Sequence, residues 1–375
     1  MRKVFKSSKR TPEYNQSKAL GVLKMFKRKY ILWGGAHRKM VYTLHSCGAI
    51  FVKNLLIFML LSVLGVKAQA ELSKYEITIL ATNIANYGGR GEWSFGALYE
   101  SASESVLFDT GFDEETMLHN ARLLNKDLSK VEKVVLSHFH SDHTGGLMRL
   151  RREYRDENAK AFSEVYVAKG FFAQRYDQSG HSLANGLTGP GLYGNPIEFK
   201  KASNALGITF IIVDEPTEIA PDLFITGPVE RKYETYVGEK GLFIKTGNLE
   251  TLTPDIILDD QSMGMMTAKG WVMMSGCGHA GIMNTSDTLQ KIAEKPIFAA
   301  MGGFHLWRAS DAEVDKTANW LVDKGIKKFM GGHCTGIRAG RRIADVAGIK
   351  PRDHSHTAVG STFTKQMEIG RSSVE

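Results

Sequence analysis

His138-Phe139-His140-Ser141-Asp142-His143 is the strongest structural signal in this chain, and it directly follows an apolar run over 131–136 that predicts a β-strand. Alternate side chains of an extended segment share a face, so His138 and His140 can bind one cation together. The following turn brings Asp142 and His143 toward a neighbouring position. Imidazoles with a carboxylate suit zinc, iron or manganese, and such groups would be costly to bury without a partner. The stretch therefore predicts a metal site at the end of a strand.

The first seventy residues differ from the rest of the chain. They hold 14 lysines and arginines and a single acid, and they end in an apolar run over 55–64 that is followed by Ala68-Gln69-Ala70. This pattern predicts a signal peptide, with a mature chain that begins near Glu71 and is exported to the periplasm or secreted. The apolar run is shorter than the about 20 residues of a transmembrane helix, which favours a cleaved signal peptide. The alternative is that the segment stays uncleaved as an N-terminal anchor. Because the basic segment is unusually long, we expect the natural start at Met40.

The remaining 305 residues, 71–375, form the predicted globular domain. Without the leader's charges, 34 basic and 39 acidic residues remain, a net charge of about −5 that does not favour binding to nucleic acid. Membrane contact is expected only through the signal segment. The domain is large enough to bury a core without disulfides. Its two cysteines, Cys277 and Cys334, each lie beside a histidine in a glycine-rich turn, either as thiols that line a site or as a disulfide.

Short β-rich runs alternate with amphipathic runs from residue 75 onward, which predicts an α/β layered domain. The expected strands cover 76–80, 105–108, 131–136, 223–226, 242–245, 255–258, 271–275, 296–300, 327–330 and, more weakly, 362–364. The expected helices cover 115–128, 281–293, 312–323 and 337–346. Residues 170–207 are rich in Gly, Asn and Pro and lack periodicity, so they predict a long loop insertion, either a lid or a solvated excursion.

The run at 138–143 resembles the His-x-His-x-Asp-His signature of the metallo-β-lactamase superfamily. That resemblance implies a four-layer αβ/βα sandwich with two metals at one edge. Asp109 resembles the superfamily's aspartate that orients the ligand-bearing loops. Four later runs resemble those of dihydropterin synthase-like metallohydrolases, so the resemblance covers about 76–346. These runs are Asp259-Asp260-Gln261-Ser262, 275–285 (SGCGHAGIMNT), Gly302-Gly303-Phe304-His305-Leu306 and Gly332-His333-Cys334-Thr335-Gly336.

The resemblance implies two sets of metal ligands. The first set is His138, His140 and His279, and the second is Asp142, His143 and His333. His305 then becomes a substrate contact. The superfamily's bridging carboxylate has no clear counterpart here, so a water or Cys277 takes that place.

Two further positions bear on the substrate. Arg231 matches an arginine of the group that can clamp a phosphate or carboxylate, or it pairs with Glu234. Trp93 stands where relatives commonly carry histidine, and it either stacks on a flat substrate ring or simply packs.

These residues predict a metal-dependent hydrolase that uses a metal-bound hydroxide on a phosphodiester, lactone or related ester. Its cofactors would be two divalent ions, zinc first, with manganese or iron as alternatives, and its partner a small-molecule substrate. Asp142 would also orient the proton of the nucleophile. A dihydropterin-type synthase is an alternative, but an exported protein would not meet a cytoplasmic precursor. A non-catalytic metal-binding or ligand-binding protein is the alternative of another class. The sequence does not determine the oligomeric state.

Overall fold

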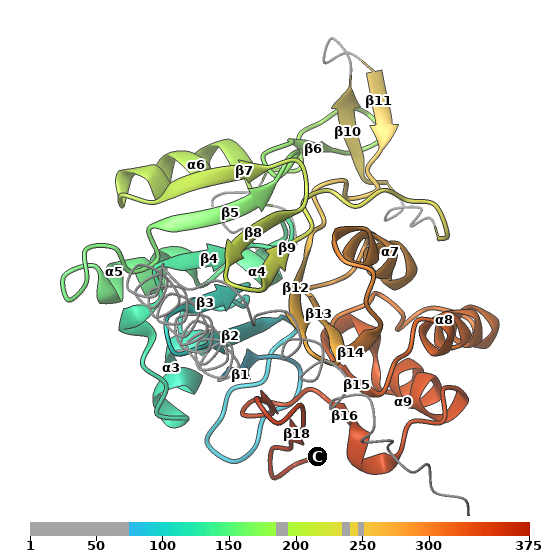
Figure 1. Cartoon of the computed structure of the whole chain (residues 1–375). Helices are drawn as coiled ribbons and strands as arrows, with labels where there is room; N and C mark the ends of the chain where they lie inside the picture. Colours follow the sequence, from blue (N-terminus) through green and yellow to red (C-terminus); the bar gives the residue numbers. More distant parts are fainter. Residues whose placement is uncertain (1–74, 185–193, 235–240, 247–250) are drawn as a thin grey trace, which may run out of the picture. The chain divides into compact units, whose positions relative to one another are not determined.

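Two β-sheets lie face to face in the computed structural model, which describes residues 75–184, 194–234, 241–246 and 251–375 (Figure 1). The first sheet has the order β18-β17-β1-β2-β3-β4-β5-β7, and the second has the order β16-β15-β14-β13-β12-β9-β8. The predicted leader lies outside the described residues, so the signal peptide and the start at Met40 stay predictions. Among the residues that the structure describes, no helix is both long and apolar enough to cross a bilayer.

The strands of the first sheet are β1 (Glu76–Ala81), β2 (Gly96–Glu100), β3 (Ser105–Phe108), β4 (Lys133–Val135), β5 (Glu164–Ala168), β7 (Thr209–Val213), β17 (Thr362–Thr364) and β18 (Ile369–Gly370). Those of the second are β8 (Thr217–Ala220), β9 (Leu223–Ile225), β12 (Ser262–Thr267), β13 (Gly270–Ser275), β14 (Ile297–Gly302), β15 (Lys328–Gly331) and β16 (His354–His356). A small third sheet joins β6 (Arg175–Tyr176), β10 (Phe243–Thr246) and β11 (Thr251–Pro254).

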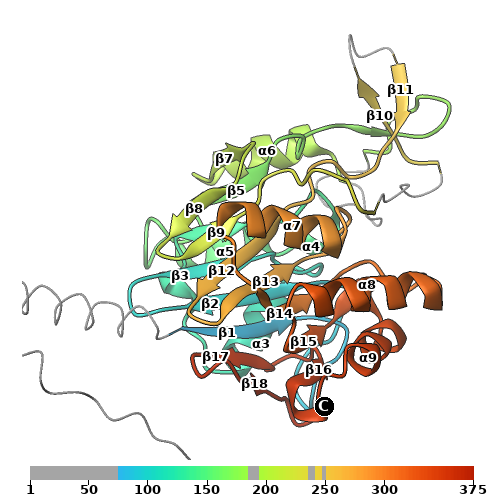
Figure 2. The same ribbon diagram turned by 45° about the vertical axis from the view of Figure 1, so that its right-hand side comes forward.

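Helices cover the outer faces of both large sheets, which makes four layers (Figures 1 and 2). On the first sheet lie α3 (Thr116–Leu123), α5 (Leu147–Tyr154) and α6 (Pro196–Ala205), and on the second lie α7 (Ile282–Ile292), α8 (Asp311–Asp323) and α9 (Ile337–Val346). The one-turn helix α4 (Ser141–Thr144) falls within the histidine-rich stretch. The predicted four-layer αβ/βα sandwich is therefore confirmed.

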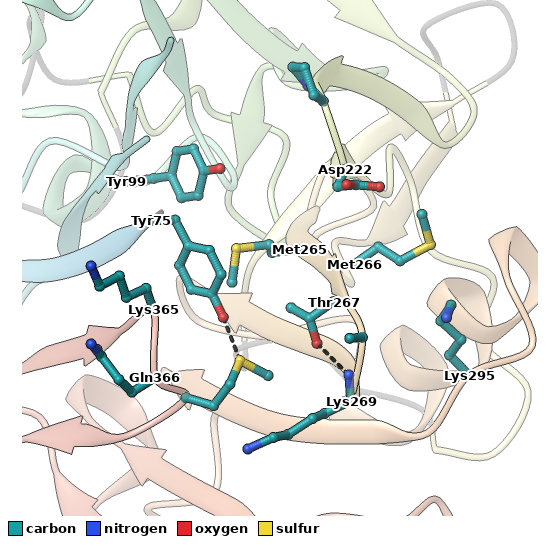
Figure 3. A pocket seen from close by; sticks show the side chains of 13 residues that line it. Tyr75, Tyr99, Asp222, Met265, Met266, Thr267, Lys269, Lys295, Lys365 and Gln366 are labelled. Carbon is teal, nitrogen blue, oxygen red and sulfur yellow. Dashed lines mark hydrogen bonds between the residues drawn. The ribbon is translucent and has the colours of Figure 1, made fainter. Parts of the chain in front are cut away.

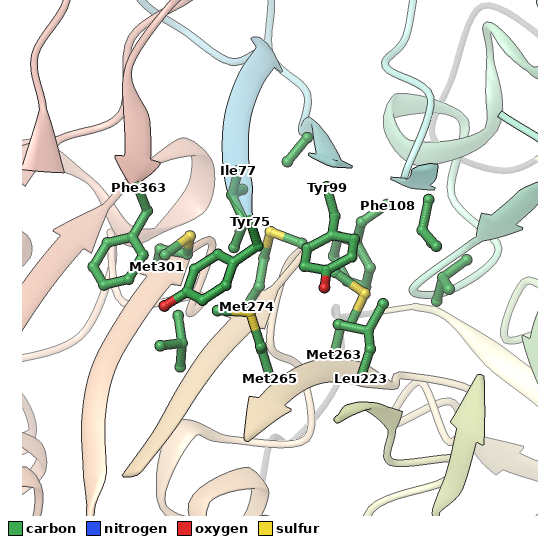
Figure 4. Close-up of a cluster of buried hydrophobic side chains, with 14 of the residues drawn as sticks. Tyr75, Ile77, Tyr99, Phe108, Leu223, Met263, Met265, Met274, Met301 and Phe363 are labelled. Atoms are coloured by element: carbon green, nitrogen blue, oxygen red, sulfur yellow. The ribbon is translucent and has the colours of Figure 1, made fainter. Parts of the chain in front are cut away.

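The alternation of side chains along the strands explains the layers. In β13, Val272 and Met274 face the first sheet, whereas Trp271 and Met273 face the helices α7–α9. The side chains between the sheets form one buried cluster, to which β1 and β14 also contribute (Figure 4). Burying one large apolar side chain contributes about 1.5–3 kcal/mol, so the buried side chains on both faces stabilise β13 in the middle of the molecule.

Two sequence predictions about irregular segments are wrong. No strand forms over 255–258, and β11 ends at Pro254. The reason is that the Asp255 carboxylate accepts the Ile257 N–H at 2.7 Å and Ile257 adopts a positive φ of 55°. The segment 170–207 contains strand β6 and helix α6 rather than only a loop, while its residues 185–193 lie outside the described part of the chain. Asn195 begins α6, since its side chain accepts the N–H groups of the two residues after Pro196 at 3.1 Å.

The parallel strand pairs determine where the chemistry lies. β3 and β4 run parallel in the first sheet, and β13, β14 and β15 run parallel in the second. Parallel neighbours end at the same edge of a sheet. The segments that follow these strands carry the predicted site residues, which are Asp109, His138, His279, His305 and His333.

Candidate metal centre

The first predicted ligand set is brought together in the fold. Ligand atoms of His138, His140 and His279 lie within 4.8 Å of one another, and all three side chains are buried. His138 Nε2 is 2.8 Å from His140 Nδ1, and Ser137 Oγ is 2.9 Å from His138 Nδ1. The contact with Ser137 occupies Nδ1 of His138, so Nε2 is the nitrogen that faces His140. The arrangement fits one ion held by three imidazoles.

The second set also converges. Asp142 Oδ2 lies 3.5 Å from His143 Nε2 and 3.3 Å from His333 Nε2. Cys277 joins them, since ligand atoms of all four residues lie within 4.8 Å of one another. Asp142 Oδ1 is buried without a hydrogen-bond partner in the described part of the chain. A buried carboxylate oxygen of this kind fits a cation, so the donor set suits a second ion.

Asp109 holds the two ligand-bearing loops together. It is buried with a positive φ of 57°, and its carboxylate accepts the N–H of Ser137 at 2.7 Å and the Ser137 hydroxyl at 2.8 Å. The same carboxylate lies 2.7 Å from His143 Nδ1. This contact fixes the ring so that Nε2 points toward Asp142 and His333, which is the orienting role that the resemblance implied.

A buried ion-pair network stabilises the histidine loop from the other side, and sequence analysis missed its centre. Arg175 lies 2.9 Å from Asp255 and 2.7 Å from Asp259. Asp259 in turn accepts the Phe139 N–H at 2.8 Å, in the middle of the histidine stretch. Arg175 lies in the segment expected to be a loop, so the sequence does not indicate its role. Of the residues in this network, only the acidic run at 259–262 is recognisable in the sequence. The next residue of that run, Asp260, accepts the Ala280 N–H at 2.8 Å beside His279.

Burial and nearby charge divide the imidazoles into two kinds. Burial lowers the pKa of His138 and His279 well below the usual value, and neighbouring imidazoles add to the effect. Burial likewise lowers the pKa of His140 to about 3. These rings are neutral, which is the form that binds metals. Burial also acts to lower the pKa of His143, but the charges of Asp142 and Asp109 outweigh it and raise this pKa well above its usual value.

The structure separates His333 from His305. His333 lies with Asp142 and His143, as the sequence analysis preferred. The His305 ring instead lies against the His279 ring, with 4.4 Å between centroids, and the backbone N–H of His305 donates to Cys334 Sγ at 3.3 Å. His305 is therefore beside the first ligand set, and its predicted contact with substrate stays a prediction.

Arg231 supports the protein backbone in this structure. Its guanidinium donates to the carbonyl of His279 and, at 2.6 Å, to that of Ile257. These bonds stabilise the loop that carries a predicted metal ligand. A contact of Arg231 with substrate remains a prediction.

A pair of contacting tryptophans lies beside the second ligand set. The Trp93 ring lies 4.9 Å from the His333 ring and 5.6 Å, edge-on, from the Trp307 ring. Trp93 is 46% exposed and Trp307 is 38% exposed. The guanidinium of Arg308 lies 4.0 Å from the Trp307 ring centroid. The sequence points to Trp93 alone, because nothing in it places Trp307 beside Trp93.

A pocket of about 450 Å³, whose lining residues Figure 3 shows, lies at the opposite edge of the sandwich. It opens beside Tyr75, Tyr99 and Met265, near the start of β1 and the β12–β13 turn. Since β13 runs from this edge to the histidine cluster, its six residues separate the two by about 20 Å. Tyr75 donates to the sulfur of Met367 here, at 2.5 Å. The pocket thus lies apart from the metal centre.

A layered αβ/βα sandwich with two histidine-rich ligand sets at one edge defines a metallohydrolase-type protein. Residues 96–235 match the family model of the metallo-β-lactamase superfamily. A 7,8-dihydropterin-6-methyl-4-(β-D-ribofuranosyl)-aminobenzene-5'-phosphate synthase from Methanocaldococcus jannaschii is 31% identical over 62% of this chain and 76% of its own length. An uncharacterised protein from the same organism is 30% identical over 72% of this chain and 94% of its own.

The crystal structure of a metal-dependent hydrolase of the β-lactamase superfamily superposes with a TM-score of 0.59. It is 27% identical and covers 77% of this chain and 98% of that protein. The chain belongs to the metallo-β-lactamase superfamily, among the relatives of the dihydropterin-type synthase.

Proposed function

We propose that this protein is an exported metal-dependent hydrolase of a phosphodiester, lactone or related ester. The observation that carries the proposal is the pair of adjacent buried ligand sets, whose rings His138 and His143 lie 4.4 Å apart between centroids. Two sites this close can act on one substrate group. Zinc is the expected ion, because imidazoles dominate both sets.

Metal ions bound there would supply an activated water and charge to stabilise the developing oxyanion. The residues of the chain have separate tasks. Asp142 holds its Oδ2 toward His143 and His333, while its Oδ1 is available to orient a proton of the attacking water. Asp109 keeps His143 in one orientation. Arg231 and His305 remain candidates for holding the substrate beside His279.

Exposed Trp93 suggests what the substrate carries. Its ring lies next to His333, and an aromatic ring holds planar groups by stacking. Trp307 meets Trp93 edge-on, and the Arg308 guanidinium already lies over the Trp307 ring. We therefore expect an ester whose leaving or retained group contains a flat ring.

A hydrolysis screen of the purified protein tests the proposal. The protein is loaded with zinc, manganese or iron and offered aryl phosphodiesters, lactones, thioesters and β-lactams. We expect turnover that a chelator abolishes and that the double variant His138→Ala/Asp142→Ala lacks. Bound metal without turnover of any class would instead favour a binding protein, and undiminished turnover by the double variant would defeat the mechanism.

A synthase is the second candidate, because one of the relatives reported above bears that name. Export argues against it, since the precursor is expected in the cytoplasm. The same purified protein is assayed with a pterin pyrophosphate and an aminobenzene acceptor. Condensation faster than any hydrolysis in the screen would replace the hydrolase proposal.

The exported location has a test of its own. N-terminal sequencing of the protein recovered outside the cytoplasm is expected to begin near Glu71. A mature protein that retains residues 1–39 would contradict both the signal peptide and the start at Met40.

A further inference from the structure

The two buried cysteines have different surroundings. Cys334 is engaged with the backbone, since its sulfur accepts the His305 N–H and donates to the Cys277 carbonyl, both at 3.3 Å. The sulfur of Cys277 instead lies 3.2 Å from Nε2 of His143 and 3.2 Å from Nε2 of His333. Those are the two nitrogens that face Asp142. One thiol is thus held by the chain, and the other points at predicted metal ligands.

The four donor atoms have the spacing of a tetrahedral site. Asp142 Oδ2, His143 Nε2, His333 Nε2 and Cys277 Sγ are joined by distances of 3.2, 3.2, 3.3 and 3.5 Å. A tetrahedron with zinc–nitrogen bonds of about 2.0 Å and a zinc–sulfur bond of about 2.3 Å has edges of about 3.3–3.6 Å. The cluster needs only small side-chain adjustments to close on an ion.

The loop that carries Cys277 is built for close approach. A Cβ at Gly276 would lie 2.3 Å from Asp109 Oδ2 and 2.3 Å from Ser137 Oγ. Glycine is therefore required where this loop packs against the residues that orient His143. The close approach puts the next side chain, Cys277, over the second ligand set rather than in the core.

We propose that Cys277 is a metal ligand of the second site, which makes that site a carboxylate–bis-imidazole–thiolate centre. The proposal rests on the two-metal part of the proposed function and not on hydrolysis. On binding, the S–H bond breaks, a metal–sulfur bond forms, and the proton leaves to solvent. A thiolate favours zinc over manganese, so the second site is selective for the softer ion.

Cobalt spectroscopy tests the proposal independently of activity. The protein is prepared with Cys47→Ser, so that only Cys277 and Cys334 remain, and is loaded with Co(II). We expect visible d–d bands together with a near-ultraviolet sulfur-to-cobalt charge-transfer band. Cys277→Ser should lose the charge-transfer band and keep the d–d bands of the nitrogen and oxygen ligands. Cys334→Ser, the matched control, should keep both.

The outcomes separate this proposal from the proposed function. Two bound cobalt ions without a charge-transfer band, or a band that Cys334→Ser removes and Cys277→Ser retains, would overturn the role of Cys277 and leave a metalloenzyme. Failure to bind any ion would overturn both.

A second measurement covers the case that Cys277→Ser does not fold. X-ray absorption on the zinc protein with Cys47→Ser should find sulfur at about 2.3 Å. Only nitrogen and oxygen neighbours would contradict the proposal. Where the variant folds, it should bind its second zinc at least about 10-fold more weakly, since loss of a direct ligand should cost no less than loss of a group that orients one. It should also release one proton fewer per pair of ions.

Discussion

Asp109 is buried and makes no direct contribution to either ligand set, yet it holds His143 and Ser137 in place. Replacing it by asparagine removes the charge that fixes the His143 ring. Asp109→Asn should therefore weaken binding of one of the two proposed zinc ions by about 10- to 100-fold and spare the other. Zinc titration calorimetry measures this, with Asp156→Asn, whose side chain is 90% exposed, as the control. Equal loss at both sites would show that Asp109 acts on the whole fold.

Trp93 lies beside the metal centre with nearly half of its surface exposed. If it stacks on a flat group, Trp93→Ala should raise KM about 2- to 10-fold for substrates with a ring and leave kcat and metal content unchanged. Trp93→Phe should restore most of the affinity. Steady-state kinetics on paired substrates, with and without the ring, decides the matter. An equal change for both substrates would mean that Trp93 only packs.

Strand β6 holds Arg175 between two buried carboxylates. Arg175→Met leaves both charges without their cation, so the free energy of unfolding should fall by about 3–5 kcal/mol. Arg122→Met removes a pair on the surface, where the arginine side chain is 60% exposed, and should cost at most about 1 kcal/mol. Denaturant unfolding compares the two. Similar small losses would mean that the buried network is easily replaced.

Helix α7 begins beside a half-buried carboxylate, that of Glu234. Glu234 accepts the Met283 N–H at 2.7 Å, and burial raises the pKa of Glu234 to about 7. Because the folded pKa exceeds the unfolded value near 4.3, this group stabilises the fold below about pH 4. As pH rises to about 7 this contribution is lost, and the free energy of unfolding falls by up to about 3 kcal/mol.

Glu234→Gln keeps an oxygen for the Met283 N–H but does not ionise. Its free energy of unfolding should exceed that of the unaltered protein increasingly between pH 4.5 and 7. Denaturant unfolding across this range measures the free energy of unfolding of both proteins. The difference between the two values removes the contributions of the other titrating groups. A difference that does not change with pH would contradict the raised pKa.

Across the whole molecule, the candidate metal centre joins the two sheets. His138 and Asp142 follow β4 of the first sheet, whereas His279 and His333 follow β13 and β15 of the second. Ions bound only by the folded protein stabilise it by mass action, by about 4 kcal/mol at a thousandfold excess over Kd. A chelator should therefore lower Tm, and zinc should restore it. The double variant His138→Ala/Asp142→Ala should show little of this shift in a thermal melt. A full shift in that variant would place the stabilising ions elsewhere.

Much of the architecture could be predicted from the sequence because it depends on local pattern. The strand over 105–108 and the helix over 337–346 have the predicted bounds, since period-two and helical spacing of apolar residues report burial directly. Helix α6 was missed because its start depends on the Asn195 side chain rather than on periodicity. The strand expected at 255–258 does not form, because the Asp255 carboxylate accepts the backbone N–H of Ile257 two residues later.

The ligand types, the α/β class and the superfamily follow from the sequence, because the histidine stretch holds four of the six predicted ligands within six residues. The resemblance implied His279 and His333 as the other two, and the folded chain shows that their side chains reach the stretch. His333 rather than His305 joins Asp142 because β14 and β15 end side by side and their loops turn differently. Arg175, Trp307 and Cys277 acquire their surroundings in the same way. Contacts between residues far apart in the chain follow from strand order and loop geometry, which no local spacing encodes.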